Sequence, residues 1–274
     1  MDVEPAPHMI AERYGLKSVP FAALAPNAVI ETMLNHRSVR AYLPAPLPSG
    51  TLETLIAAAQ SAPTSSNMQA WSVVAVEDAA RRDRLAAFAN NQDFVRQAPL
   101  LLCWIADLSR LDRLGRAHGR RLEGLDYLEC FMVALADAAF AAQNTVVAAE
   151  SLGLGTCYVG ALRNRPDAVA RELDLPPNAV AVFGLTVGRP DPAVPSAVKP
   201  RLPQTLVLHR EAYRTEAADD IAHYDETLAA FSERAGMGRT AWAPRMLNRV
   251  GSGASLSGRD RMRAVLNALG FGLK

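Results

Sequence analysis

The chain has 274 residues, a mass of 29.5 kDa and a formal net charge of +1, and this length permits one large domain or two small ones. The near-neutral charge excludes nonspecific electrostatic binding to nucleic acid or to an anionic membrane. Hydrophobic residues make up 50% of the chain and charged residues 21%, a composition that supports a buried core and excludes overall disorder. We therefore expect a folded protein whose chemistry depends on local clusters of residues.

The first half of the chain predicts helices that alternate with strands. Residues 1–26 are rich in alanine and proline and predict an N-terminal extension rather than a packed element. Helices are expected over residues 28–35, 51–62 and 78–90, and strands over residues 72–77 and 99–107. Ser49 is placed to cap the second helix and Pro63 to end it. Residues 108–125 predict a mobile helix or excursion.

Residues 127–152 form one long stretch that is apolar nearly all round and ends at Gly153 and Gly155. Its length would suit a bilayer. However, Glu129, Asp137 and Glu150 are spread along it, and each charge would be costly in lipid. We therefore expect a helix that is buried in a protein core or in a subunit interface.

The second half of the chain predicts two further strands and then changes in composition. Strands are expected over residues 156–162 and 179–188, and helices over residues 165–174, 216–235 and 259–269. Between them lie a proline-rich extended segment (189–203), a basic turn (236–242) and a Gly/Ser-rich loop (251–258).

The three cysteines, Cys103, Cys130 and Cys157, are odd in number and widely spaced, which excludes a disulfide scaffold. No CxxC pair is present, so a zinc ribbon is excluded as well. The first residues include acidic side chains and lack the apolar run of a secretory signal. We expect a cytoplasmic protein.

Several common catalytic motifs are missing from the sequence. It contains no GxxxxGK[ST], no GxGxxG after a strand and no GxSxG, which argues against a P-loop, a Rossmann dinucleotide fold and an α/β-hydrolase. The five histidines have no metal-ligand spacing. We therefore expect neither a metal site nor a catalytic side chain, and chemistry supplied by a cofactor.

Four polar clusters could bind such a cofactor. His36–Arg40 (HRSVR) can hydrogen-bond a phosphate and a carbonyl-rich ring, although basic residues also favour any helix C-terminus. The other three are the hydroxyl-rich loop 64–69, Lys199–Arg201, and 158–161, where a glycine after a strand permits close backbone approach. Each of these alone also fits an ordinary turn, a strand end or a solvent-exposed segment.

Taken together and in this order, the clusters resemble one family. HRSVRAY (36–42), TSSNMQ (64–69), AESLGLGTCYVGALRN (149–164) and KPRLP (199–203) are similar to the nitroreductase family, within its NADPH-dependent branch of oxygen-insensitive nitroreductases and flavin reductase P. The resemblance implies an α+β fold with a central mixed β-sheet flanked by helices, a long buried core helix and an intertwined homodimer. It also implies an extension over residues 1–26 and an FMN-binding domain over residues 27–274.

The resemblance further implies a site for FMN, with His36, Arg37, Ser38 and Arg40 toward its phosphate, ribityl chain and pyrimidine end. The remaining FMN residues that it implies are Thr64, Ser65, Ser66, Gln69, Gln92, Tyr158, Val159, Gly160, Ala161, Lys199 and Arg201. Lys199 and Arg201 would form a second grip on the phosphate. For the 2′-phosphate of NADPH, the resemblance implies Arg234, Arg239 and Arg259.

The implied activity is that of an FMN-dependent NADPH oxidoreductase. It would reduce nitroaromatics, quinones or free flavin by ping-pong hydride transfer through FMN N5. Two alternatives stay open at this point: another flavin reaction of the family, such as ene-reduction or reductive dehalogenation, and a flavin-binding protein without significant turnover. The expected partners are small-molecule electron acceptors and a second copy of the chain, but not nucleic acid or a membrane.

Overall fold

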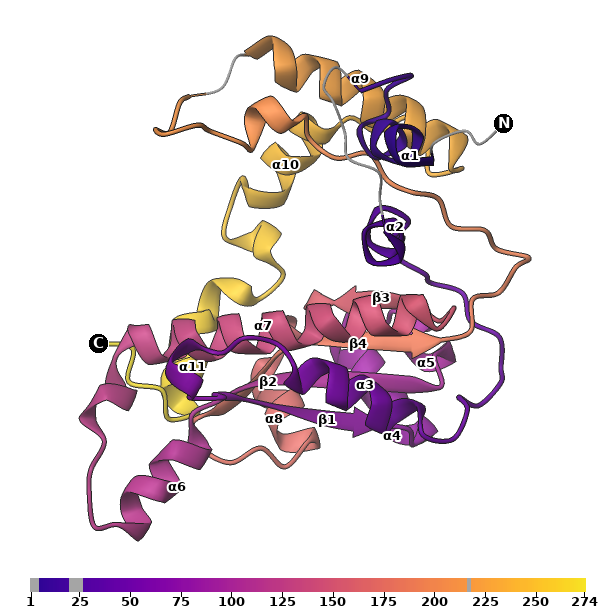
Figure 1. Cartoon of the computed structure of the whole chain (residues 1–274). Coiled ribbons are helices and arrows are strands. Elements are labelled where there is room, and N and C mark those ends of the chain that lie inside the picture. Colours follow the sequence, from indigo (N-terminus) through magenta and orange to yellow (C-terminus); the bar gives the residue numbers. More distant parts are fainter. Residues whose placement is uncertain (1–4, 20–26, 216–217) are drawn as a thin grey trace. The chain divides into compact units, whose positions relative to one another are not determined.

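The structure is a computed structural model that describes residues 5–19, 27–215 and 218–274 (Figure 1). The chain divides into two compact units. Unit 1 contains the described residues up to Arg37 together with Pro195–Leu256, and unit 2 contains Ser38–Val194 together with Ser257–Lys274. Both units are therefore built from segments that are far apart in the sequence.

Unit 2 is organised around a four-stranded sheet. Its strands are β1 (Trp71–Val76), β2 (Leu100–Asp107), β3 (Gly155–Val159) and β4 (Ala179–Gly188). They pair in the order β1-β2-β4-β3, and every pairing between them is antiparallel. The sheet is therefore antiparallel and not mixed as expected, and among the described residues the parallel pairing is an isolated bridge between Ser38 and Thr156 at the β3 edge.

Helices cover both faces of this sheet. The helices of unit 2 are α3 (Thr51–Gln60), α4 (Ala79–Phe88), α5 (Asp93–Gln97), α6 (Ser109–Ala117), α7 (Leu128–Ser151), α8 (Pro166–Glu172) and α11 (Met262–Ala268). Helices α3 and α7 pack on one face, and α4, α5 and α8 pack on the other (Figure 1). The α+β fold class expected from the sequence is confirmed.

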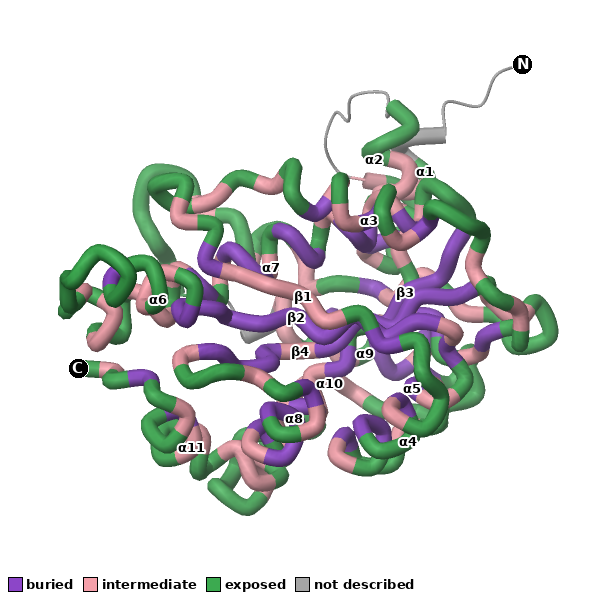
Figure 2. The backbone as a smooth tube through the Cα atoms, turned by 90° about the horizontal axis from the view of Figure 1, so that it is seen from below, coloured by how far each residue is buried: buried purple, intermediate pink, exposed green. Residues whose placement is uncertain are grey.

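The sequence of β2 is apolar from Leu100 to Ala106 because both faces of this strand are covered. Because successive side chains point to opposite faces, Leu102 and Trp104 pack toward α3 and α7, whereas Cys103 and Ile105 pack toward α4 and α8. Both faces are covered, so every residue of β2 is buried (Figure 2). A strand with one solvated face would have alternated polar and apolar residues instead.

Helix α7 is the long helix expected over residues 127–152. By length and composition it could cross a membrane, but it packs against the sheet through small side chains such as Ala134, Ala138 and Ala141. These alanines let the helix backbone approach the sheet closely. The expected core helix is confirmed, although Met132 and Phe140 on other parts of its surface are about half exposed.

Unit 1 is helical in its described residues. Its helices are α1 (Pro5–Tyr14), α2 (Ala28–Leu34), α9 (Ala218–Arg234) and α10 (Trp242–Val250). The expectation that residues 1–26 contain no packed element is wrong for α1, because Ala11 and Arg13 on this helix are buried. The remaining extension residues, 1–4 and 20–26, lie outside the described part of the chain.

Three local expectations differ from the structure. Helix α3 is capped by Gly50 and not by Ser49, because the backbone there has a φ of 80°, which glycine adopts without strain. Helix α5 lies within residues for which no element was expected. Helix α10 begins at Trp242, the last residue of the expected basic turn, and covers residues for which the sequence predicts no element.

Candidate functional site

The basic residues after α2 and those near residue 200 are joined in unit 1 through the side chain of Arg13. Its Nη2 donates to the carbonyl oxygens of Leu34 at 2.5 Å and His36 at 2.9 Å. Its Nη1 donates to the carbonyl oxygen of Lys199 at 3.1 Å. The backbone N–H of Arg201 also donates to the Arg13 carbonyl oxygen at 2.9 Å. The start of the HRSVR motif and the KPRLP motif therefore lie side by side.

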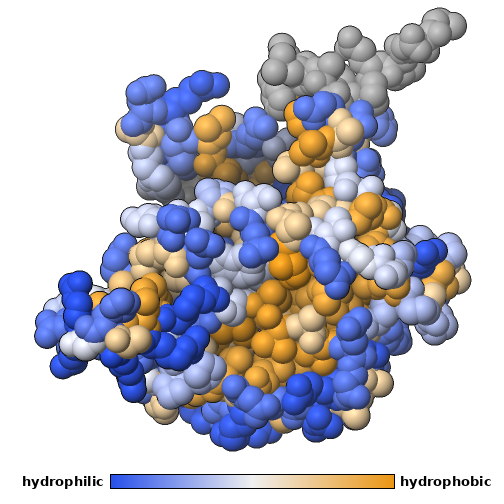
Figure 3. All heavy atoms as spheres, turned by 60° about the horizontal axis from the view of Figure 1, so that its bottom comes forward, coloured by the Kyte–Doolittle hydropathy of each residue, from blue (hydrophilic) through white to orange (hydrophobic). Residues whose placement is uncertain are grey.

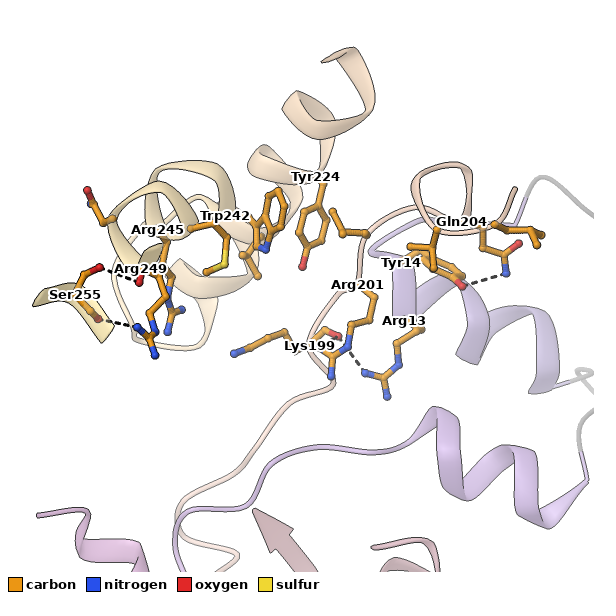
Figure 4. A pocket seen from close by; sticks show the side chains of 16 residues that line it. Arg13, Tyr14, Lys199, Arg201, Gln204, Tyr224, Trp242, Arg245, Arg249 and Ser255 are labelled. Carbon is orange, nitrogen blue, oxygen red and sulfur yellow. Dashed lines mark hydrogen bonds between the residues drawn. The ribbon is translucent and has the colours of Figure 1, made fainter. Parts of the chain in front are cut away.

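A cavity of about 1180 Å³ adjoins the second of these segments within unit 1 (Figure 4). Five cationic residues line it: Arg13, Lys199, Arg201, Arg245 and Arg249. No aspartate or glutamate occurs among the described residues of its lining. Like charges that face one cavity repel one another, so this arrangement favours an anionic ligand.

Two aromatic rings form part of the wall of this cavity (Figure 4). Tyr224 on α9 and Trp242 on α10 meet edge to face, with their ring centroids 6.0 Å apart. The hydroxyl of Tyr224 donates to the carbonyl oxygen of Pro200 at 3.0 Å, which ties the KPRLP segment to α9. Burial raises the pKa of Tyr224, so this hydroxyl keeps its proton at neutral pH.

The two arginines on α10 lie one turn apart and therefore share a face of the helix. The start of α10 is held by Asp225, whose Oδ1 accepts hydrogen bonds from the backbone N–H groups of Trp242 at 2.9 Å and of the next residue at 2.8 Å. Arg249 donates to the carbonyl oxygen of Ser255 at 2.7 Å. Arg245 has no ion-pair partner in the part of the chain that the structure describes.

The loop Thr64–Gln69 in unit 2 has an unusual backbone. Ser66, Asn67 and Gln69 have φ angles of 49°, 54° and 47°, in the left-handed region that side chains other than glycine disfavour. Such conformations persist only where surrounding contacts enforce them. The side chains of Ser65, Ser66 and Gln69 are exposed, so the loop presents hydroxyl and amide groups to a ligand.

A buried carboxylate enforces this loop conformation. Asp137 on α7 is 1% exposed, and its two oxygens accept from the backbone N–H groups of Ser65 at 3.2 Å and Ala70 at 3.1 Å. The hydroxyl oxygen of Thr64 accepts from the N–H of Gln69 at 2.9 Å. Asp137 therefore holds both ends of the loop, and Thr64 closes it internally.

The second half of HRSVR lies along the edge of β3 in unit 2. Ser38 pairs with Thr156, and the N–H of Val39 donates to the Thr156 carbonyl oxygen at 2.9 Å. This close approach requires Gly155, since a Cβ there would lie 2.7–2.9 Å from the side-chain carbons of Val39. The guanidinium of Arg40 lies 6.0 Å from the ring centroid of Phe94, a cation–π distance.

Residues 158–161, which the resemblance implies at FMN, begin at the end of strand β3. Tyr158 is 38% exposed, its ring packs edge to face on Phe183, and its hydroxyl lies 3.4 Å from Gln143 Oε1. Val159 is buried, so it can offer a ligand only backbone groups. Gly160 and Ala161 begin the 3₁₀ turn Gly160–Asn164. Gln92, at the start of α5, carries a buried Oε1 that has no hydrogen-bond partner among the described residues.

None of the three arginines expected at NADPH is among the lining residues of the cationic cavity. Arg234 lines a different cavity in unit 1. Arg239 pairs with Glu226 at 2.5 Å and with Glu233 at 3.4 Å. In unit 2, the Nε of Arg259 donates to Asn164 Oδ1 at 2.8 Å.

Comparison with known proteins places these features in a family. Residues 33–189 match the Nitroreductase family, and residues 199–274 match the Nitroreductase family, C-terminal domain. The chain belongs to the nitroreductase family.

Two curated relatives and one solved structure illustrate how closely this nitroreductase-family chain resembles known members. It is 40% identical over 229 residues to FMN reductase (NADPH) of Bacillus subtilis, covering 81% of this chain and 91% of that protein. It is 38% identical over 205 residues to NADPH-flavin oxidoreductase of Vibrio harveyi, covering 75% and 82%. The structure of Vibrio harveyi NADPH:FMN oxidoreductase complexed with NAD⁺ superposes with a TM-score of 0.81 at 33% identity, covering 90% of this chain and all of that one.

Sequence reasoning did not single out four residues that the structure shows in contact with, or beside, the candidate segments: Arg13, Arg245 and Arg249 in unit 1, and Asp137 in unit 2. Asp137 carried a usable signal, because a carboxylate inside an apolar helix needs buried hydrogen-bond partners. The spacing of Arg245 and Arg249, one helical turn apart, was a second usable signal. Arg13 carried none, since it lies before both family matches and in a stretch without helical periodicity.

The Asp137 clamp leads to a stability prediction. Asp137→Asn replaces one of the two accepting oxygens by an NH₂ group that faces a backbone N–H. We expect the free energy of unfolding to fall by about 1–3 kcal/mol, the cost of a buried unsatisfied donor. Urea denaturation measures this change. Glu129→Gln makes the same acid-to-amide change at an exposed position of α7 and should have little effect. Equal values for the two variants would contradict the clamp.

Proposed function

We propose that this chain is an NADPH-dependent FMN oxidoreductase that reduces nitroaromatics, quinones or free flavin. The observation that carries the proposal is the cavity in unit 1, which has five cations, no acidic residue among its described lining and an aromatic wall. A phosphorylated ligand with a flat ring suits these features. The names of the two curated relatives, FMN reductase (NADPH) and NADPH-flavin oxidoreductase, support the same activity.

The residues present fit FMN by the chemistry of their donors and acceptors. Lys199 and Arg201 can form charge-assisted hydrogen bonds with a phosphate. The exposed hydroxyls of the loop Thr64–Gln69 suit a ribityl chain. The buried Oε1 of Gln92 needs a donor, and the imide N–H of a flavin ring is a group of that kind.

We propose as FMN contacts the residues that the resemblance implies. His36, Arg37, Ser38 and Arg40 would meet its phosphate, ribityl chain and pyrimidine end, and Lys199 and Arg201 would form a second grip on the phosphate. The remaining residues are Thr64, Ser65, Ser66, Gln69, Gln92, Tyr158, Val159, Gly160 and Ala161. Residues 27–274 would then form the FMN-binding domain, which residues 1–26 precede.

Hydride transfer through N5 is the chemistry that FMN supplies when it is bound. The chain contributes binding, orientation and charge. Cationic side chains near the ring, such as Arg40, would offset the negative charge of a reduced flavin. No side chain needs to act as a nucleophile, in keeping with the absence of such motifs from the sequence. A ping-pong order would follow if NADP⁺ left before the acceptor bound in its place.

The activity is tested by titrating the FMN-loaded protein with NADPH under anaerobic conditions. We expect the flavin absorbance to bleach and then to recover on addition of nitrofurazone, a quinone or free FMN. In steady-state kinetics, double-reciprocal plots of the initial rate at several acceptor concentrations should be parallel. Arg201→Ala should weaken FMN binding by about 10- to 100-fold, because it removes a charge-assisted hydrogen bond. Bound FMN that NADPH does not bleach would instead indicate a flavin-binding protein without turnover. Failure of the wild-type protein to bind FMN would overturn the proposal.

We propose Arg234, Arg239 and Arg259 for the 2′-phosphate of NADPH, with Arg239 as the one to test first. To bind the phosphate, Arg239 must exchange its contacts with Glu226 and Glu233 for the ligand. We expect Arg239→Ala to raise the KM for NADPH about tenfold or more, the loss of one charge-assisted contact, and to leave the KM for NADH unchanged. Steady-state kinetics with both cofactors measures this. If only Arg245→Ala shows that pattern, the cavity of unit 1 holds the 2′-phosphate instead.

We also propose that the chain forms a homodimer through α7. Leu128, Met132 and Leu135 follow a helical spacing along α7 and are 45%, 55% and 38% exposed. Exposed apolar stripes of this kind mark association surfaces, and a second copy is the occupant that the apolar character of α7 suits. Figure 3 shows that hydrophobic residues also form a continuous area on one face of the molecule.

The α7 stripe gives a prediction for the oligomeric state. Sedimentation should give a wild-type mass of about twice 29.5 kDa. Met132→Glu places a charge in the stripe, and we expect it to shift the protein toward the monomer, since burying an unpaired charge is costly. Leu114→Glu, at a 53% exposed position of α6, is the matched control and should stay dimeric. A monomeric wild-type protein would contradict the proposal.

We propose a cytoplasmic location for this activity. The three cysteines are widely spaced in the sequence, and Cys103 and Cys157 are buried. A chain without a disulfide scaffold suits a reducing compartment. The same compartment supplies the NADPH that the proposed reaction consumes.

A further inference from the structure

Helix α1 is a packed part of unit 1 although it precedes the residues that match the family. Ala11 is 2% exposed, and the hydroxyl oxygen of Tyr14 accepts from Gln204 Nε2 at 3.1 Å. Gly15 ends the helix with a φ of +64°, and a Cβ there would lie 2.4 Å from a methyl carbon of Thr227 on α9. The C-terminal end of α1 is therefore held closely against α9 and against the segment that follows the KPRLP motif.

The position of α1 places Arg13 between the two basic segments of unit 1. Its guanidinium donates to the carbonyl oxygens of Leu34, His36 and Lys199, and its own carbonyl oxygen accepts from Arg201 N–H. The planar guanidinium fork can hold several acceptors in a fixed relation, and it keeps its charge at any physiological pH. Since both terminal nitrogens donate to backbone oxygens, Arg13 acts on the geometry of the two segments.

The positive charges of the two basic segments make a link between the segments necessary. Arg37 follows the first segment, and Lys199 and Arg201 belong to the second, so like charges are gathered where the segments meet. Without a link, their mutual repulsion would favour separation of the segments. Arg13 adds one more positive charge, but three carbonyl dipoles offset it while it ties the segments together.

We propose that Arg13 is a positioning residue for the phosphate end of the FMN site. It holds the backbone of His36 and of Lys199–Arg201 so that their cationic groups meet one phosphate. This inference rests on the proposed function, because it takes FMN as the ligand. It goes beyond the family resemblance, since α1 lies before both matched regions.

The test compares FMN with riboflavin, which has the same ring and ribityl chain but no phosphate. The dissociation constants of both are measured by fluorescence quenching with the full-length apoprotein. Arg13→Ala should weaken FMN binding by about 10- to 100-fold, the loss of one or two charge-assisted contacts, and leave riboflavin binding unchanged. Arg210→Ala makes the same change at an exposed arginine of unit 1 that does not line the cavity, and it serves as the matched control, which should bind both ligands as the wild type does.

The outcomes separate this inference from the proposed function. If the wild type does not bind FMN, the proposed function fails. If the wild type binds FMN and Arg13→Ala does so equally well, only the inference on Arg13 fails. Equal losses for FMN and riboflavin would overturn it too, because they would indicate general damage to the fold. If Arg13→Ala does not fold, Arg13→Lys retains the charge without the planar fork, and the same selective loss of FMN is expected.

Discussion

A charged group that leaves water must find hydrogen-bond partners, and this requirement organises both units of the protein. Arg13 in unit 1 and Asp137 in unit 2 are buried, and each is satisfied by backbone groups. In both cases these backbone groups belong to polar segments that the sequence marks as candidate cofactor contacts. The buried charge therefore fixes the backbone shape of a segment through its carbonyl or N–H groups.

The sheet of unit 2 supplies the rigid frame that positions the polar segments of that unit. Because helices cover both of its faces, β2 is buried throughout and the sheet cannot shift without disturbing two layers of packing. Glycines then decide where other segments approach it. Gly155 admits Val39, and Gly188 admits the ring of Tyr42, whose nearest carbon would lie 2.7 Å from a Cβ at that position. Ser38 and Val39 are thereby held at the β3 edge.

Periodicity and composition predicted the strands and most of the helices, because apolar runs are a local property. The family was predicted correctly from the resemblance of four ordered motifs, which are also local. They did not predict α1 or α10, whose short stretches are rich in proline or in charge and become helical through packing within unit 1. Ser49 was a reasonable cap by residue type, but the left-handed backbone at Gly50 overrode that preference. The roles of the FMN and NADPH residues rest on the resemblance and remain predictions.

The sequence by itself determined the kinds of groups that this protein can offer: cations in HRSVR and KPRLP, hydroxyls in the loop 64–69, and no nucleophile or metal cluster among its motifs. Only the tertiary structure decided which of them meet. Arg13 joins segments that lie far apart in the chain, and Arg245 and Arg249, unlike Arg234, line the cavity with Lys199. The physical reason is that a hydrogen bond or a shared cavity depends on distance in space, which residue order alone does not specify.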